Sequence, residues 1–399
     1  TSVVCAGDGF LSKGLYKGIA SDAELVLLKV MDDKGKISTE NIAKALKWVL
    51  RNHKKYNIRI VNMSLGDDEP TSYKTSVVDQ LAEKVIAAGI SIVAAVGNDV
   101  ASSIKPPANA LHVIAIGGID DENKLGNDQQ QLYHSSFGKT IDDLSKPELI
   151  ANSIWIAAPM PRATDDQEEA KILYDWLALN DDELLTALRK KIIFTKLGKE
   201  LIHTTDATII RNAIISRIQQ AKYISSDYMH VDGTSFAAPI VCSVLAQLLE
   251  ANPSLTPLQI REALFNTAKK LPAFAVERQG FGIIQPREAL LKVLNHDFGK
   301  THPSSPYIDK KSDVVEFFIR DYAARGISLV GSFNNWQKDA LLLKPFEKGL
   351  WKIEFPLPSP GDYLYKFLVN GTEWRADTDN PFREPDGYGG WNSVLRIEG

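Results

Sequence analysis

Residues 233–239 read Gly-Thr-Ser-Phe-Ala-Ala-Pro, and they lie where a polar loop runs into an apolar helix expected over residues 235–250. A serine at such a helix start has two interpretations. It can cap the helix by accepting a hydrogen bond from the first turn. The free N–H groups and the dipole of a helix N-terminus also favour negative charge beside the serine, so a functional role for it stays open as the second interpretation. Gly233 allows close approach of another backbone, and Ala237 and Ala238 let the helix pack tightly.

Upstream of this stretch, residues 24–119 alternate short apolar runs with longer amphipathic ones. This pattern indicates a parallel sheet that is covered by helices on both faces, hence an α/β domain. Two apolar stripes at helical spacing predict helices between the strands. The stripes are Ile42, Ala45, Leu46 and Val49, then Val78, Leu81, Val85 and Ile86, and the strands are predicted at residues 25–30, 58–63, 91–95 and 112–116.

The remaining chain divides by composition. Residues 165–222 are dense in charge, carry Leu and Ile at helical intervals, and are predicted to form a helical insertion in a domain that spans residues 1–295. Helices are also predicted from the Thr256-Pro257 pair and near Pro286. Residues 296–312 suit a linker, and the short strands expected within residues 313–399 predict an immunoglobulin-like β-sandwich.

Composition excludes several classes of protein. The 399 residues are 44% hydrophobic and 24% charged, which is ordinary globular usage. A formal net charge of -4 predicts neither a nucleic-acid partner nor an anionic membrane surface, and no apolar run approaches a bilayer span. Cys5 and Cys242 are too few for a disulfide framework or a zinc site. The opening run Thr-Ser-Val-Val-Cys-Ala-Gly reads like the middle of a buried element, so we expect a fragment.

Several ordered stretches resemble subtilisin-like serine peptidases, the subtilases. Besides residues 233–239, these are VNMSLG (61–66), AAVGND (94–99), SSFG (135–138), KPELIA (146–151) and GFGIIQPREAL (280–290). The resemblance implies that Ser235 is the nucleophile and that Asn98 stabilises the oxyanion. It implies that Ser64, Leu65 and Gly66 bind an extended polypeptide substrate by strand pairing. It further implies secretion and no cofactor for the chemistry, and it allows a structural calcium ion, although no dense carboxylate loop supports one.

The resemblance also exposes a gap in the catalytic triad. A serine nucleophile needs a base and an acid that orients the base. None of the upstream histidines, which are His53, His112, His134, His203 and His230, is followed by the Gly-Thr that begins the family's histidine helix. Residues 1–7 resemble the helix directly after that motif, so the family's His and Asp are expected upstream of Thr1. We therefore expect residues 1–399 alone to be inactive. The alternative is a non-catalytic carbohydrate-binding or scaffold protein on a degenerate peptidase fold.

The C-terminal region resembles family 48 carbohydrate-binding modules, including the glycogen-binding domain of AMP-activated kinase β subunits. The stretches that carry this resemblance are LVGSFNNWQ (329–337), YLYKFLVNGTEWRADTDNP (363–381) and GYGGWNSVLRI (387–397). The resemblance implies an α-glucan partner, glycogen or starch, bound by Trp336, Lys366, Trp374 and Asn392. A related sandwich with its tryptophans in the core stays open as an alternative, for which Trp351 and Trp391 are the better core candidates.

Overall fold

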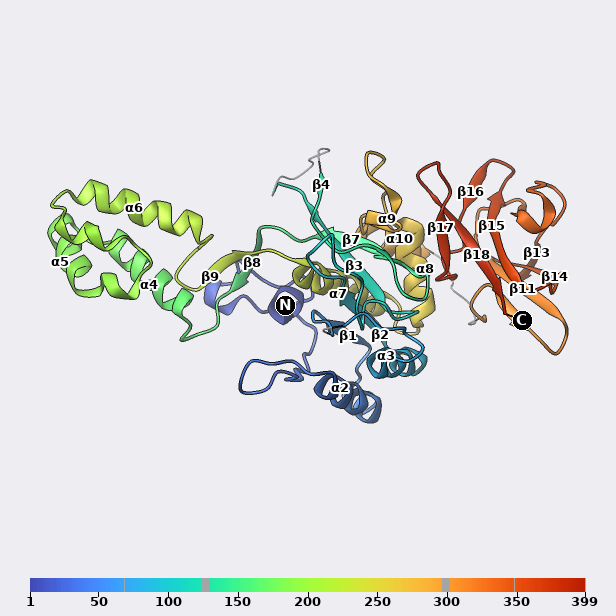
Figure 1. Ribbon diagram of the computed structural model, residues 1–399, viewed down its shortest axis with the longest axis horizontal. Helices are drawn as coiled ribbons and strands as arrows, with labels where there is room; N and C mark the ends of the chain where they lie inside the picture. Colours follow the sequence, from blue (N-terminus) through green and yellow to red (C-terminus); the bar gives the residue numbers. More distant parts are fainter. Residues whose placement is uncertain (68, 123–129, 296–301, 348, 399) are drawn as a thin grey trace.

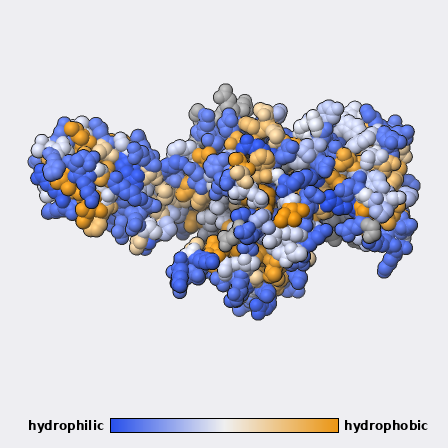
Figure 2. All heavy atoms as spheres, in the orientation of Figure 1, coloured by the Kyte–Doolittle hydropathy of each residue, from blue (hydrophilic) through white to orange (hydrophobic). Residues whose placement is uncertain are grey.

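The computed structural model describes residues 1–67, 69–122, 130–295, 302–347 and 349–398. Figure 1 shows three bodies side by side along the long axis: a helical lobe, a central α/β domain and a β-sandwich. On the face drawn in Figure 2, hydrophilic residues dominate and apolar residues form separate groups. The central domain therefore joins a helical lobe to a sandwich, and both sites described below are built on it or at its edge.

The central domain is built on a parallel sheet of four strands, β1 (Ile60–Met63), β2 (Ser91–Ala95), β3 (Ile114–Asp120) and β7 (Leu149–Asn152), in that order. A short strand, β4 (Gln131–Leu132), runs antiparallel to the end of β3. Short elements complete the domain: α1 (Ser2–Ala6), the 3-10 helix η1 (Phe10–Ser12), β5 (Gly138–Lys139), β6 (Ser145–Lys146) and α9 (Val276–Gln279).

Helices cover both faces of the sheet, as the sequence predicted. Alternate strand residues point to opposite faces. On β2, Ile92 packs with α2 (Thr39–Asn52) and α3 (Val77–Ala87), whereas Val93 packs with α7 (Thr234–Ala251), α8 (Pro257–Thr267) and α10 (Pro286–Asn295). The central helix α7 contacts all four parallel strands. The expectation that no apolar run approaches a bilayer span is wrong for this helix, because its 18 residues are long and apolar enough to cross a membrane by length and composition; 56% of them are buried inside the structure.

The predicted strand at residues 25–30 is wrong. These residues form no strand, and their apolar side chains are largely exposed, with Leu25 at 47% and Leu27 at 72%. A groove of about 790 Å³ lies beside them and is also lined by β1, α2 and α7. A strand needs a backbone partner. The groove separates residues 25–30 from β1, and the two segments do not pair. The nearest regular pairing of residues 25–30 is an isolated bridge between Met31 and Ile37.

Residues 165–222, expected to be a helical insertion, hold α4 (Asp165–Leu177), α5 (Asp181–Lys191), α6 (Ala207–Gln220), η2 (Ile192–Phe194) and η3 (Lys199–His203). The lobe has an apolar core of its own, which includes Leu173, Leu184 and Ile210. An antiparallel ribbon of β8 (Ile156–Pro159) and β9 (Tyr228–Val231) joins it to the central domain (Figure 1). Because β9 ends two residues before Gly233, the lobe is attached directly next to residues 233–239.

The C-terminal region is a sandwich of two antiparallel sheets. One has the order β10 (Tyr307–Asp309), β11 (Val314–Arg320), β14 (Leu350–Pro356), β13 (Lys344–Glu347). The other has β12 (Ile327–Gly331), β15 (Gly361–Val369), β18 (Trp391–Ile397), β17 (Arg383–Pro385), with β16 (Glu373–Arg375) on β15 and η4 (Ser332–Asn334) after β12. β10 lies inside the predicted linker, so the sandwich begins before residue 313, because residues 307–309 pair with β11. Residues 296–301 lie outside the described residues.

Candidate active site and carbohydrate site

Ser235 is the second residue of α7, at the C-terminal side of the sheet's central strands. Gly233, the N-cap of this helix, has a φ of +128°, which side chains rarely adopt, and a Cβ there would lie 3.2 Å from the Asn98 amide nitrogen. The close approach of Asn98 therefore requires glycine. The first N–H groups of a helix lack the usual intrahelical partner. At the start of α7 the Thr234 N–H donates to Asn98 and those of Phe236 and Ala237 donate to the Gly233 carbonyl, so among the described residues the Ser235 N–H is the one left to donate.

Asn98, which follows β2, is held against the same helix start. Its Oδ1 accepts hydrogen bonds from the Thr234 backbone N–H at 2.8 Å and from the Thr234 hydroxyl at 2.9 Å. With the oxygen occupied in this way, the Nδ2 amide group is the end of the side chain left to donate. Thr234 was not singled out from the sequence, although its place beside the serine in residues 233–239 was a signal. It positions the predicted oxyanion donor.

Ser64 lies directly beside the nucleophile candidate. Its hydroxyl donates to the Ser235 carbonyl at 2.8 Å, and it accepts from the Asn62 side chain at 3.0 Å. Ser64 and Leu65 are half-buried and Gly66 is exposed, so the segment after β1 remains accessible from solvent. The structure thus brings Ser64, Asn98 and Ser235 together at one end of the sheet.

The five upstream histidines are placed elsewhere or held by other groups. A hydrogen bond of 2.7 Å joins His112 to Glu83, and the Nδ1 atoms of His53, His134 and His230 lie within hydrogen-bonding distance of backbone carbonyls of Leu50, Asn98 and Trp155. His203 belongs to η3 in the helical lobe. In the ranges that the structure describes, no hydrogen bond joins a histidine to Ser235. Nor does that part of the chain contain a group of three or more His, Cys, Asp or Glu side chains that could hold a metal ion.

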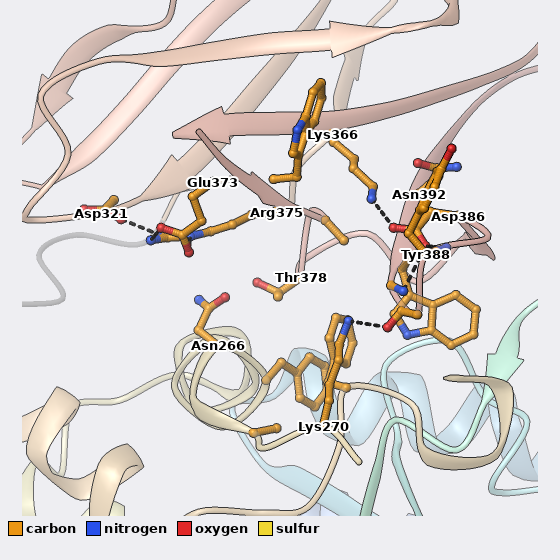
Figure 3. A pocket seen from close by; sticks show the side chains of 18 of the residues that line it. Asn266, Lys270, Asp321, Lys366, Glu373, Arg375, Thr378, Asp386, Tyr388 and Asn392 are labelled. Atoms are coloured by element: carbon orange, nitrogen blue, oxygen red, sulfur yellow. Dashed lines mark hydrogen bonds and ion pairs between the residues drawn. The ribbon is translucent and has the colours of Figure 1, made fainter. Parts of the chain in front are cut away.

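A second site is a cavity of about 1130 Å³ between the sandwich and the central domain (Figure 3). Trp336, Lys366, Trp374 and Asn392, all predicted from the sequence, line its sandwich side. Trp336 is 37% and Trp374 is 41% exposed, and their ring centroids lie 6.4 Å apart. Exposed aromatic faces of this kind suit the apolar faces of sugar rings. Trp391, in contrast, is 2% exposed and packs in the core of the central domain.

Lys366 reaches this cavity as part of an ion pair. Its ammonium group contacts Asp386, which also accepts hydrogen bonds from the backbone N–H groups of Tyr388 and Gly390 (Figure 3). Burial opposes ionisation of Asp386, but the hydrogen bond from Lys366 and the two N–H donors lower the pKa of its carboxyl group. The pair therefore presents fixed polar groups to the cavity with its charges balanced.

The two domains that enclose the cavity are joined by buried contacts. The Arg383 guanidinium lies between the rings of Phe281 and Trp391, at 4.7 and 5.0 Å from their centroids. It donates to the backbone carbonyl of Ser145 at 2.7 Å, and the Trp391 ring N–H donates to the Gly280 carbonyl at 2.9 Å. These contacts hold the sandwich in a defined position against the central domain.

Comparison with known proteins gives the family of each of the two domains. Residues 1–282 match the model described as the subtilase family, which covers well over half of the chain, and the chain belongs to this family. Residues 317–399 match the model described as the glycogen recognition site of AMP-activated protein kinase, and the C-terminal sandwich is a module of this type.

Individual relatives match the central domain. The chain is 28% identical over 283 residues to the serine protease AprX of Bacillus subtilis (strain 168), covering 67% of this chain and 52% of that protein. It is 25% identical over 254 residues to subtilisin BL of Lederbergia lenta, covering 64% of each. A cuticle-degrading serine protease of Arthrobotrys oligospora is 30% identical over 169 residues, covering 42% of this chain and 36% of that protein. The chain thus spans about half the length of the first of these relatives.

Proposed function

We propose that the protein is a serine endopeptidase in which Ser235 is the nucleophile and Asn98 stabilises the oxyanion. The observation that carries this proposal is the anchored Asn98 side chain, whose oxygen is held by Thr234 and whose amide nitrogen is free to donate. A donor fixed before the reaction stabilises negative charge without reorganisation. A degenerate scaffold would have no chemical reason to keep this arrangement beside a serine at a helix start.

The proposed chemistry is acyl transfer. The Ser235 hydroxyl oxygen attacks the peptide carbonyl carbon, and the carbonyl electrons move to oxygen, where Asn98 and the start of α7 stabilise them. The hydroxyl proton passes to a general base, which returns it to the leaving amine as the acyl-enzyme forms. Water then hydrolyses the acyl-enzyme. Ser64, Leu65 and Gly66 would bind the polypeptide by strand pairing, close to Ser235.

We propose that the general base and the acid that orients it lie outside residues 1–399. The placement of the histidines supports this, as does the groove beside β1. Among the described residues β1 pairs only with β2, so its other edge is unpaired. An extended segment seated in the groove would pair with β1 and cover the exposed Leu25 and Leu27. Residues 1–399 alone would then hydrolyse casein no faster than their Ser235→Ala variant.

We further propose that the C-terminal module binds α-glucan, through Trp336 and Trp374 stacked on sugar rings and Lys366 and Asn392 bonded to hydroxyls. The exposure of both tryptophans at one cavity supports this, because a core tryptophan such as Trp391 is buried. Retention on immobilised amylose tests it. We also propose that the protein is secreted, and this proposal rests on its family alone.

A further inference from the structure

One wall of the cavity at the carbohydrate site belongs to the peptidase domain. Asn266 in α8 and Lys270 just beyond it line the cavity opposite the module, together with the apolar residues Phe265, Ala268 and Phe281. Figure 3 shows Asn266 and Lys270 on the helix side and Lys366, Tyr388 and Asn392 across from them. The site predicted from the module's sequence is therefore only one half of the enclosure.

The chemistry of this second wall suits a neutral polyol. The Asn266 amide group offers both a donor and an acceptor to a hydroxyl. The Lys270 ammonium donates to the Gly389 carbonyl at 3.1 Å, and two further N–H bonds remain available to a ligand. Burial lowers the pKa of Lys270, against the attraction of Asp386, while the side chain stays exposed enough for a ligand to reach it.

Most other charged side chains of the cavity wall are ion-paired within the protein, including Arg320 with Glu262, whereas Lys292 forms no ion pair among the described residues. Lys366 pairs with Asp386, and Arg375 pairs with both Asp321 and Glu373. Side chains paired in this way act as fixed hydrogen-bonding groups that a neutral ligand can use. The two half-exposed tryptophans supply the apolar contact that a sugar ring needs.

We propose that an α-glucan chain binds in the cleft between the two domains and that Asn266 and Lys270 of the peptidase domain contact it directly. This inference rests on the proposed glucan binding by the module. The cavity of about 1130 Å³ exceeds the roughly 300–1,000 Å³ of sites for drug-sized ligands, so it accommodates an oligosaccharide. Because Arg383 and Trp391 fix the two domains against each other, the cleft is preformed. Bound glucan then bridges the domains.

Calorimetric titration of residues 1–399 with maltoheptaose tests the proposal. Lys270→Ala and Asn266→Ala are each expected to weaken binding about 3- to 10-fold, the effect of losing one hydrogen bond. Lys269→Ala is the matched control, because Lys269 is also exposed but does not line the cavity, and it should bind like the wild type. Asn266→Ala is included as a second variant because Lys270→Ala also removes the hydrogen bond that the Gly389 carbonyl accepts.

Chemical labelling of lysines gives a readout without any substitution. Saturating maltoheptaose should protect Lys270 from acetylation and leave Lys269 unprotected. Unchanged affinity in both Lys270→Ala and Asn266→Ala, with binding abolished by Trp336→Ala, would overturn the bridging site and leave glucan binding by the module intact. Absence of binding by the wild type would overturn both. Equal labelling of Lys270 with and without ligand would also overturn the bridging site.

Discussion

Asn98 and Thr234 are 136 residues apart in the chain, yet Thr234 donates two hydrogen bonds to the side-chain oxygen of Asn98. One comes from its backbone N–H and one from its hydroxyl, so a substitution of Thr234 removes only the hydrogen bond from the hydroxyl. The amide nitrogen of Asn98 is thereby directed away from Thr234. The orientation of the proposed oxyanion donor therefore depends on the residue next to the proposed nucleophile.

The first prediction concerns this pair in a form of the protein that extends upstream of Thr1 and hydrolyses casein. Asn98→Ala should lower kcat about a hundred- to a thousandfold, the magnitude established for subtilisin, with little change in KM. Thr234→Val should lower kcat about tenfold, since one hydrogen bond to Asn98 remains. Thr267→Val is the control, because the Thr267 hydroxyl bonds within α8. Wild-type kcat in Asn98→Ala would refute the role of Asn98.

The second prediction concerns Asp79, a buried carboxyl group in α3. Burial raises its pKa to about 7 from 3.8, against the opposing influence of the nearby Ser76 hydroxyl, and neither carboxylate oxygen has a hydrogen-bond partner among the described residues. A raised carboxyl pKa favours the folded state below the unfolded pKa, and this contribution is lost as the pH rises from about 4 through about 7. Asp79→Asn stays neutral, so its stability relative to the wild type should rise by about 2–4 kcal/mol between pH 4 and pH 8.

Urea unfolding of both proteins at pH 4, 6 and 8 measures this difference. Glu262 and Asp379, whose pKa values burial raises to about 7 and about 6, are present in both proteins and cancel in the comparison. A difference in unfolding free energy that does not change with pH would show that Asp79 does not titrate in this range.

The third prediction concerns the joint between the domains. Arg383→Ala removes two hydrogen bonds to the backbone of Ser145 and Pro147 and leaves a void between two aromatic rings. It should destabilise the protein by about 2–4 kcal/mol and separate the unfolding of the sandwich from that of the peptidase domain. Arg396→Ala loses partly exposed pairs with Asp362 and, at 3.5 Å, with Asp143 of the central domain, and should cost about 1 kcal/mol or less. A single unchanged transition in Arg383→Ala would contradict the prediction.

The fourth prediction concerns glucan binding by the module. Wild-type protein should be retained on amylose, and Trp336→Ala or Trp374→Ala should release it, because each loses an aromatic face that a sugar ring covers. Trp155→Ala is a matched control, since Trp155 is 39% exposed but lies in the peptidase domain near β8. Retention of both module variants at the wild-type level would mean that these tryptophans do not bind sugar.

Local patterns predicted much of the fold. Residues 91–95 form β2 with the predicted bounds, and the Thr256-Pro257 pair begins α8 with a capping box. Residues 25–30 are also short and apolar, but they lie across the groove from the unpaired edge of β1 and form no strand. Strand propensity reports how well a residue fits a sheet and says nothing about whether a partner is present.

In the candidate sites too, the sequence predicted some residues and not others. Residues within motifs, such as Asn98 and Trp374, were identified from the sequence and lie where a site can use them. Asn266 and Lys270 belong to no motif. Their place opposite the module depends on how two domains pack, through contacts between residues as distant as Ser145 and Arg383. A pattern within one segment does not contain that information.

The central claim is that residues 1–399 carry the nucleophile and the oxyanion donor but lack the general base. Casein hydrolysis by the purified chain and by its Ser235→Ala variant tests it most directly. We predict the same negligible rate for both, because a serine without a base is a poor nucleophile at neutral pH. Measurable turnover that disappears in Ser235→Ala would contradict the claim and would place a base within these residues.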